Sequence, residues 1–187
     1  MKNKSAITAT IGFMCLGLAN WMASMPAAGW FERIYGSGIA IVYPLAIILG
    51  VMGILAFVHG CALDSIIFFG GSGLFWSAHL SMITPADDPG SYFGWYFFVW
   101  FVFFCYVWFG SFKAGLSRFL FLLGQWLTLL ALAIGSWGGA HLHIITRIGG
   151  YLGLITAILA AIASATAVIG NGLSTTNPNN DSRAASS

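Results

Sequence analysis

Charged side chains are rare in this sequence, and most of them stand at the ends of long apolar stretches. Asp, Glu, Lys and Arg make up 6% of the 187 residues, whereas a soluble domain carries about 25%. Hydrophobic residues make up 59% of the chain. So few charges cannot cover the surface of a water-soluble protein, which excludes a cytosolic enzyme, a nucleic-acid binder and a disordered chain. The composition predicts an integral membrane protein with nearly the whole chain in the lipid bilayer.

Charges, prolines and glycines divide the chain into six apolar stretches, each close to the length of a membrane span. A helix needs about 20 apolar residues to cross the hydrocarbon core of a bilayer. The predicted spans are 7–26, 36–58, 62–83, 92–112, 116–135 and 147–170. We therefore predict an all-α, six-helix transmembrane domain over residues 1–170. Residues 171–187 are rich in Ser, Asn and Thr, and they are predicted to form a disordered polar tail.

Six spans place both termini on one side of the membrane, and the basic residues indicate which side. Cytoplasmic loops carry an excess of Lys and Arg. Most basic residues of this chain fall on the side of the termini, while Arg33 and Arg147 fall on the other. This distribution predicts that both termini are cytoplasmic. The alternative is that residues 1–28 are a cleaved signal peptide, which would leave five spans.

Polar side chains inside the predicted spans are the first candidates for function, because polar groups are costly at membrane depth. Gln125 and Asn20 are candidates to line a water-filled path, or else to hydrogen-bond a neighbouring helix. His79 is a candidate for pore contact, proton movement or haem ligation, or else for a structural hydrogen bond near the membrane surface. Asp64 lies near a span start, where a carboxylate complements the helix dipole; the alternative is proton carriage.

Two spans have unusual compositions. The third contains the run Gly70-Gly71-Ser72-Gly73 near its middle. Such a run either lets another helix approach closely, or breaks the helix and exposes N–H groups that bind an anion. The fourth span is dominated by aromatic residues from 92 to 109. They predict a broad packing surface towards lipid or another subunit, with contact to a flat cofactor as the alternative.

The sequence contains no recognisable pattern for catalysis or cofactor binding. His141 and His143, taken with His79, suggest a metal site, but two rings at this spacing on a helix point apart and no acidic cluster lies nearby. There is no Ser/His/Asp set, phosphate-binding loop or nucleotide fingerprint. We therefore expect no enzyme activity, no metal and no cofactor, and we expect function to lie between helices or between subunits.

Local motifs along most of the chain resemble those of the acetate uptake transporter family, which includes the bacterial succinate–acetate permeases. The matching segments, in order, are Ile11-Gly12-Phe13-Met14 with Gly17, Leu74-Phe75-Trp76 after the glycine run, Phe109-Gly110-Ser111-Phe112-Lys113, Leu132-Ala133-Ile134-Gly135, and Gly150-Tyr151-Leu152-Gly153-Leu154. The order, the spacing and the predicted topology all agree with the family.

The chain departs from the family pattern at two places. The family's diagnostic Asn-Pro-Ala-Pro-Leu-Gly motif corresponds here to residues 7–12, which contain neither Asn nor Pro. The family's narrowest point is formed by a Phe, a Tyr and a Leu, and the aligned residues here are Leu16, Gly71 and Gln125. Because two rings are lost and one apolar residue becomes an amide, the resemblance implies a wider and more polar constriction.

The resemblance implies a homohexamer in the bacterial inner membrane, with a narrow path through each six-helix protomer. It further implies movement of small monocarboxylates such as acetate, and possibly succinate, through a channel or together with protons. Leu16, Gly71, Asn20, Ser72 and Gln125 would then line the path, and His79 would exchange a proton.

Three other functions remain open from the residues. A channel for a neutral solute such as urea, a short amide or ammonia would suit a wide, polar constriction. An accessory subunit would dock to a larger complex through the aromatic fourth span. A haem-bearing redox anchor would use the histidines.

Overall fold

The computed structural model of the chain describes residues 2–30, 37–83, 89–138 and 142–175, with side chains described for 4–30, 42–78, 91–138 and 142–169. All regular structure in these residues is helical, which confirms the predicted all-α fold. The helices are α1 (Lys2–Ala27), α2 (Ser37–Val58), α3 (Ala62–Ile83), α4 (Pro89–Gly110), α5 (Leu116–Trp137) and α6 (His143–Thr175).

The helix ends lie close to the predicted span ends because the same residues terminate them. Pro89 opens α4, where a missing N–H costs nothing, and Pro26 precedes the last residue of α1. Gly60 adopts a φ of 76° in the short turn between α2 and α3. Helix α6 continues to Thr175, into the stretch from residue 171 that was expected to be a polar tail. Residues 176–187 of that tail lie outside the described part.

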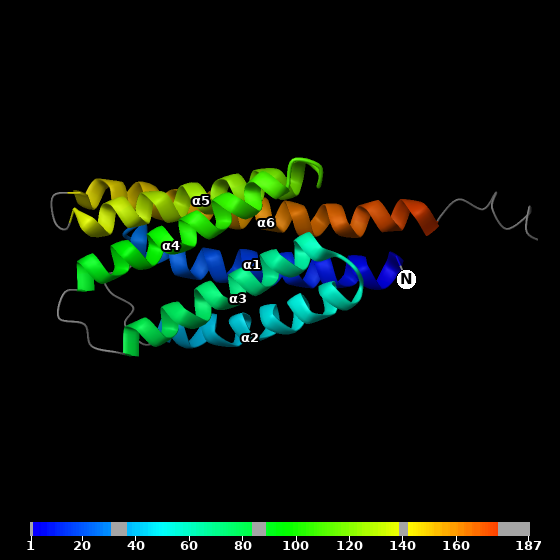
Figure 1. Ribbon diagram of the computed structural model, residues 1–187, viewed down its shortest axis with the longest axis horizontal. Coiled ribbons are helices and arrows are strands. Elements are labelled where there is room, and N and C mark those ends of the chain that lie inside the picture. The colour runs from blue at the N-terminus through cyan, green and yellow to red at the C-terminus, as the bar shows by residue number, and fades with distance from the viewer. Residues whose placement is uncertain (1, 31–36, 84–88, 139–141, 176–187) are drawn as a thin grey trace, which may run out of the picture.

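The six helices run roughly along one long axis. The beginning of α1 and the C-terminal end of α6 lie at the same end of the molecule (Figure 1). Each helix packs against its neighbours in a closed order: α1 on α2 and α6, α5 on α6 and α4, and α3 on α2. The contact between α3 and α4 is much the weakest in this ring. Four helices contain described stretches long and apolar enough to cross a membrane, and α2 and α3 contain shorter apolar ones.

Small residues let α1 and α6 approach closely. A β-carbon added at Gly17 would lie 3.0 Å from the carbonyl oxygen of Ala157, and one added at Gly150 would overlap the backbone of Ala28. Ser164 of α6 also donates a hydrogen bond to the Thr10 carbonyl over 2.8 Å. The small residues on this face of α6 therefore form a packing surface between helices.

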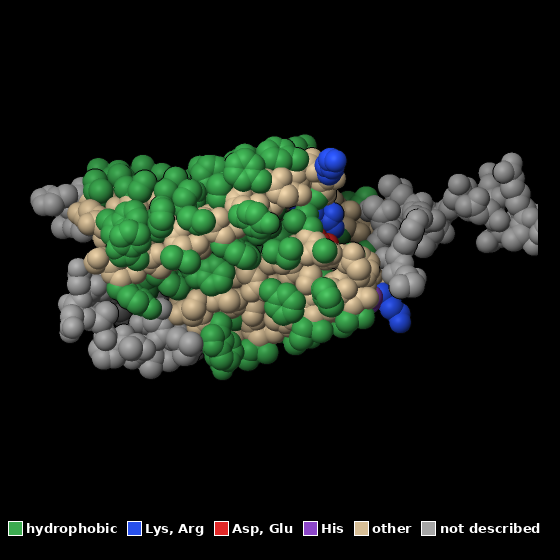
Figure 2. All heavy atoms as spheres, in the orientation of Figure 1, with side chains coloured by type: hydrophobic (Ala, Val, Ile, Leu, Met, Phe, Trp, Pro, Cys, Tyr) green, Lys and Arg blue, Asp and Glu red, His purple; other side chains and the backbone are tan. Residues whose placement is uncertain are grey.

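Large apolar side chains cover the outside of the bundle (Figure 2). Phe57 on α2 and Tyr106 on α4 are 72% and 77% exposed, for example, as expected for side chains that meet lipid. On the face shown in Figure 2, the Lys and Arg side chains lie at the end of the bundle where the chain begins. The chain is therefore built to face a bilayer on its sides and water at its ends.

Aromatic side chains of α4 pack over the glycine run of α3. Helix α3 is continuous from Ala62 to Ile83, so the predicted alternative of a broken helix is wrong. A β-carbon at Gly70 would overlap the ring of Phe103, and one at Gly73 would lie 2.8 Å from Trp100. Because the backbones of α3 and α4 make few close contacts, large rings from α4 fill the space over the glycines.

Candidate functional site

Helices α1, α3 and α5 turn buried faces towards one another. Residues three or four apart share one face of a helix. Buried residues at this spacing form three stripes, which we call the inner stripes: Ala9, Phe13, Leu16, Asn20 and Ser24 on α1; Asp64, Phe68, Gly71 and Phe75 on α3; and Phe121, Gln125 and Thr128 on α5, which Arg118 precedes by one turn. The interior between α1, α3 and α5 is the candidate site, and at the far ends of two stripes Ser24 and Thr128 pack against Gly153 of α6.

Three rings meet in the phenylalanine layer, formed by Phe13, Phe68 and Phe121. The Phe13 ring centroid lies 5.2 Å from that of Phe68 and 5.7 Å from that of Phe121, at interplanar angles of 74° and 80°. These are edge-to-face contacts, which aromatic pairs prefer. All three side chains are fully buried. The layer packs between α1, α3 and α5, within two turns of the beginnings of α3 and α5.

An ion pair links α3 to α5 beside the phenylalanine layer. Arg118 Nε lies 2.8 Å from Asp64 Oδ1, and Arg118 Nη2 donates to Asp64 Oδ2 over 2.9 Å. The Arg118 guanidinium carbon also stands 6.0 Å from the centre of the Phe13 ring. Asp64 does lie in the first turn of α3, as predicted. However, the helix-dipole interpretation missed its principal partner, because the sequence does not show which side chain faces it.

Leu16 and Gly71 meet one turn further along. A β-carbon at Gly71 would overlap Leu16 Cδ1 and would lie 3.6 Å from Leu49 Cδ1. The Leu16 side chain therefore occupies the space that a larger residue at position 71 would fill. The wider and more polar constriction that the family resemblance implies stays a prediction.

Asn20 on α1 and Gln125 on α5 lie at similar heights beyond Leu16, and we call this level the amide layer. Helices α1 and α5 run in the same direction, because Phe13 contacts Phe121 at one level and Ser24 and Thr128 both approach Gly153 at another. Asn20 and Gln125 fall between these two levels. The Asn20 amide donates to the Leu16 carbonyl over 3.1 Å.

Gln125 is the least satisfied polar side chain of the inner stripes. It is 2% exposed, and within the described residues its Oε1 has no hydrogen-bond partner. The next turn of α5 does not supply one, since the Thr128 hydroxyl donates to the Gly124 carbonyl and contacts Thr156 Oγ1 at 3.3 Å. A buried amide of this kind costs free energy unless a water or solute donates to it.

The remaining sequence candidates lie elsewhere or outside the described side chains. Ser72 donates to the Ala46 carbonyl over 2.8 Å, so its hydroxyl is used in the contact between α3 and α2. His79 belongs to α3, but its side chain is among those not described, and His141 is not described at all. No group of three His, Cys, Asp or Glu side chains suited to a metal occurs in the described part of the chain.

The phenylalanine layer and the ion pair were not predicted from the sequence. Phe13, Phe68 and Phe121 look like ordinary apolar residues of a span, and Arg118 looks like a residue that marks a loop. The available signal was their spacing from the candidates. Phe121 precedes Gln125 by one helical turn, and Phe13 precedes Leu16 by three residues.

Comparisons with known proteins place the fold. A scan against protein-family models and a search of curated proteins find no match to this chain. A search of solved structures finds the bacterial acetate channel SatP, with a TM-score of 0.78 and 20% sequence identity, over 88% of this chain and 93% of the other. The chain therefore has the SatP fold. This likeness agrees with the predicted all-α fold, which has six helices in the described part of the chain.

Proposed function

We propose that the chain is a membrane channel or proton-coupled transporter for small monocarboxylates such as acetate. The observation that carries the proposal is the fold shared with the bacterial acetate channel SatP over 88% of the chain. The inner stripes are compatible with this cargo. Beyond the ion pair they contain rings, aliphatic groups, hydroxyls and amides, which suit a small weak acid better than a strongly charged solute such as succinate.

In this proposal the solute passes between α1, α3 and α5. It meets the phenylalanine layer, then Leu16 beside Gly71, and then the amide layer. Because the three rings fill the interior, passage requires at least one of them to move. Of the other predicted path residues, Ser72 is used in the contact between α3 and α2, and contact of His79 with the path stays a prediction.

A channel for a small neutral solute is a second candidate, and Gln125 favours it. A primary amide both donates and accepts hydrogen bonds, so the buried Gln125 side chain complements urea or acetamide as well as a carboxylic acid. Ammonium or ammonia is smaller and would use only the acceptor oxygen.

Uptake of labelled acetate, acetamide and urea into proteoliposomes separates the two candidates. The assay is run at neutral pH, where ionised acetate crosses lipid slowly, with protein-free liposomes as the reference. Acetate uptake above that reference, with acetamide and urea at background, supports the monocarboxylate function. Uptake of the neutral solutes with acetate at background replaces it by the second candidate. A proton gradient that raises acetate uptake distinguishes a proton-coupled transporter from a channel.

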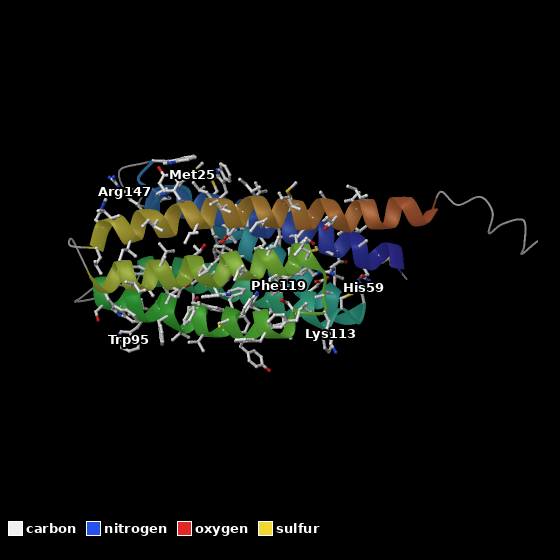
Figure 3. All side chains as sticks on the ribbon, turned by 90° about the horizontal axis from the view of Figure 1, so that it is seen from above. Met25, His59, Trp95, Lys113, Phe119 and Arg147 are labelled. Atoms are coloured by element: carbon white, nitrogen blue, oxygen red, sulfur yellow. The ribbon has the colours of Figure 1, made fainter. Side chains whose placement is uncertain are left out.

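Assembly and orientation are also proposed. Both termini are placed in the cytoplasm of a bacterial inner membrane, since Lys113 and the beginning of α1 lie at one end of the bundle and Arg147 at the other (Figure 3). The proposed assembly is the homohexamer that the family resemblance implies. The exposed aromatic rings of α4 are one surface available for its subunit contacts. Native mass spectrometry in detergent tests this state, and a mass of one or two chains would contradict it.

A further inference from the structure

Asp64 and Arg118 are two of the few charged residues of this chain, and burying them together costs desolvation free energy. Taking two charges out of water is repaid only by good geometry, and apolar residues often stabilise a protein equally well at such a site. The pair also stands at a particular place, on the inner stripes and beside the phenylalanine layer. These two features suggest a role beyond holding α3 to α5.

The two partners differ in their access to water. The Arg118 side chain is 33% exposed, while that of Asp64 is 6% exposed. Arg118 therefore forms the accessible side of the pair, and Asp64 lies behind it. Arg118 also precedes Phe121 of the phenylalanine layer by three residues, about one helical turn.

The guanidinium can serve a second carboxylate. Arg118 donates through Nη1 to the Ala114 carbonyl over 3.2 Å and through Nη2 to Asp64 over 2.9 Å, and its Nε lies 2.8 Å from Asp64 Oδ1, which leaves the second N–H of each of Nη1 and Nη2 for another acceptor. A guanidinium carries five N–H groups in a planar fork that matches a carboxylate. Contact with the Phe13 ring on one side holds the group over the phenylalanine layer.

We propose that Arg118 is the carboxylate-binding residue at this entrance to the path, and that Asp64 is a built-in competitor that keeps the binding weak. Acetate carries the same functional group as Asp64, so it binds Arg118 against the repulsion and competition of that side chain. Weak binding suits transport, because a solute that is held tightly at an entrance leaves it slowly. This inference rests on the proposed monocarboxylate function and names the residue that selects the anion.

The test uses the purified full-length protein in detergent and measures the dissociation constant for sodium acetate from acetate-dependent thermal stabilisation. Sodium chloride at equal ionic strength corrects for screening, and acetamide serves as the neutral analogue. Asp64→Asn should bind acetate at least about tenfold more tightly than the wild type, because it removes a negative charge beside the guanidinium. Asp64→Asn with Arg118→Gln should lose the acetate effect. The double variant is used because Arg118→Gln alone would leave a buried carboxylate without its partner.

Two further variants complete the design. Lys113→Gln removes an exposed positive charge at the same end of the molecule and should bind acetate as the wild type does. Arg118→Lys keeps the charge but loses the planar fork, so its binding should lie between those of the wild type and the double variant. A purely structural ion pair predicts the opposite pattern, with both Asp64 variants less stable and neither changed in acetate affinity, and that result would overturn the inference.

The outcome is separable from that of the proposed function. If proteoliposomes with the wild type take up acetate but the dissociation constant is the same for all variants, the transport proposal stands and the role of Arg118 is rejected. If uptake fails but Asp64→Asn tightens acetate binding and the double variant abolishes it, the site stands and the transport proposal is rejected.

Discussion

At the scale of single residues, Gln125 combines deep burial with an unused hydrogen-bonding group. Burial without a partner costs about 1 to 3 kcal/mol, and leucine of similar size would remove that cost. We expect Gln125→Leu to raise the free energy of unfolding by about 1 kcal/mol while it lowers acetate uptake several-fold. The opposite signs distinguish a functional amide from a structural one.

Thermal unfolding in detergent and uptake into proteoliposomes measure the two effects of Gln125→Leu. Ser111→Ala is the control, because it also removes a buried polar group, but one that donates to the Trp108 carbonyl and lies outside the inner stripes. Unchanged uptake by Gln125→Leu would remove this residue from the path.

Leu16 and Gly71 offer a second prediction at the residue scale. Gly71→Ala places a methyl group into Leu16 Cδ1, and overpacking of this kind costs about 1 to 3 kcal/mol. Leu16→Ala makes room for that methyl group, so the double variant should be less destabilised than the sum of the two single variants.

Gly110→Ala is the matched control for Gly71→Ala, since no atom lies within 4 Å of a β-carbon built there. It should leave the free energy of unfolding almost unchanged. Strict additivity of Leu16→Ala and Gly71→Ala would show that the two residues do not meet.

Sequence reasoning located part of this site. The family resemblance pointed to Leu16, Gly71 and Gln125, and all three lie on the inner stripes, although their role in a path remains a prediction. It missed Phe13, Phe68 and Phe121 together with the ion pair. Contacts between helices depend on how each helix is rotated about its axis, and apolar spans with charges only at their ends leave that rotation undetermined.

At the scale of elements, the helices were predictable because the charges, prolines and glycines that end them are visible in the sequence. The pairing of α3 with α4 was not. From the sequence, three glycines in a span fit either a broken helix or close approach of another helix. The structure instead places the rings of Trp100 and Phe103 over Gly73 and Gly70. The aromatic composition of α4 follows from the same fact, since rings fill a wide gap between backbones.

The seam between α3 and α4 can be tested by removing a ring. Phe103→Ala should lower the free energy of unfolding by about 3 kcal/mol or more, because no backbone contact can close the cavity over Gly70. Phe57→Ala is the control with the same chemical change on a side chain that is 72% exposed. Equal effects of the two substitutions on thermal unfolding would mean that Phe103 does not fill the seam.

At the scale of the whole molecule, we propose that a small solute crosses the bundle between α1, α3 and α5. The ring of helices, the inner stripes and the fold shared with SatP all lead to it. Other routes through an oligomer, such as a passage between subunits, would leave the inner stripes untouched. The faces of a single helix therefore discriminate between these possibilities.

Cysteine modification on α1 tests this claim most directly. Asn20→Cys lies on the inner stripe, and Leu18→Cys, two residues away, replaces a side chain that is 51% exposed on the outer face. Both are made in a background whose native cysteines are replaced by alanine. The cysteine thiolate, which forms in water but not in lipid, attacks a charged methanethiosulfonate reagent, forms a mixed disulfide and releases methanesulfinate. We predict that the reagent stops labelled acetate uptake by Asn20→Cys and leaves that of Leu18→Cys unchanged. Uninhibited uptake by Asn20→Cys after verified modification would contradict the claim.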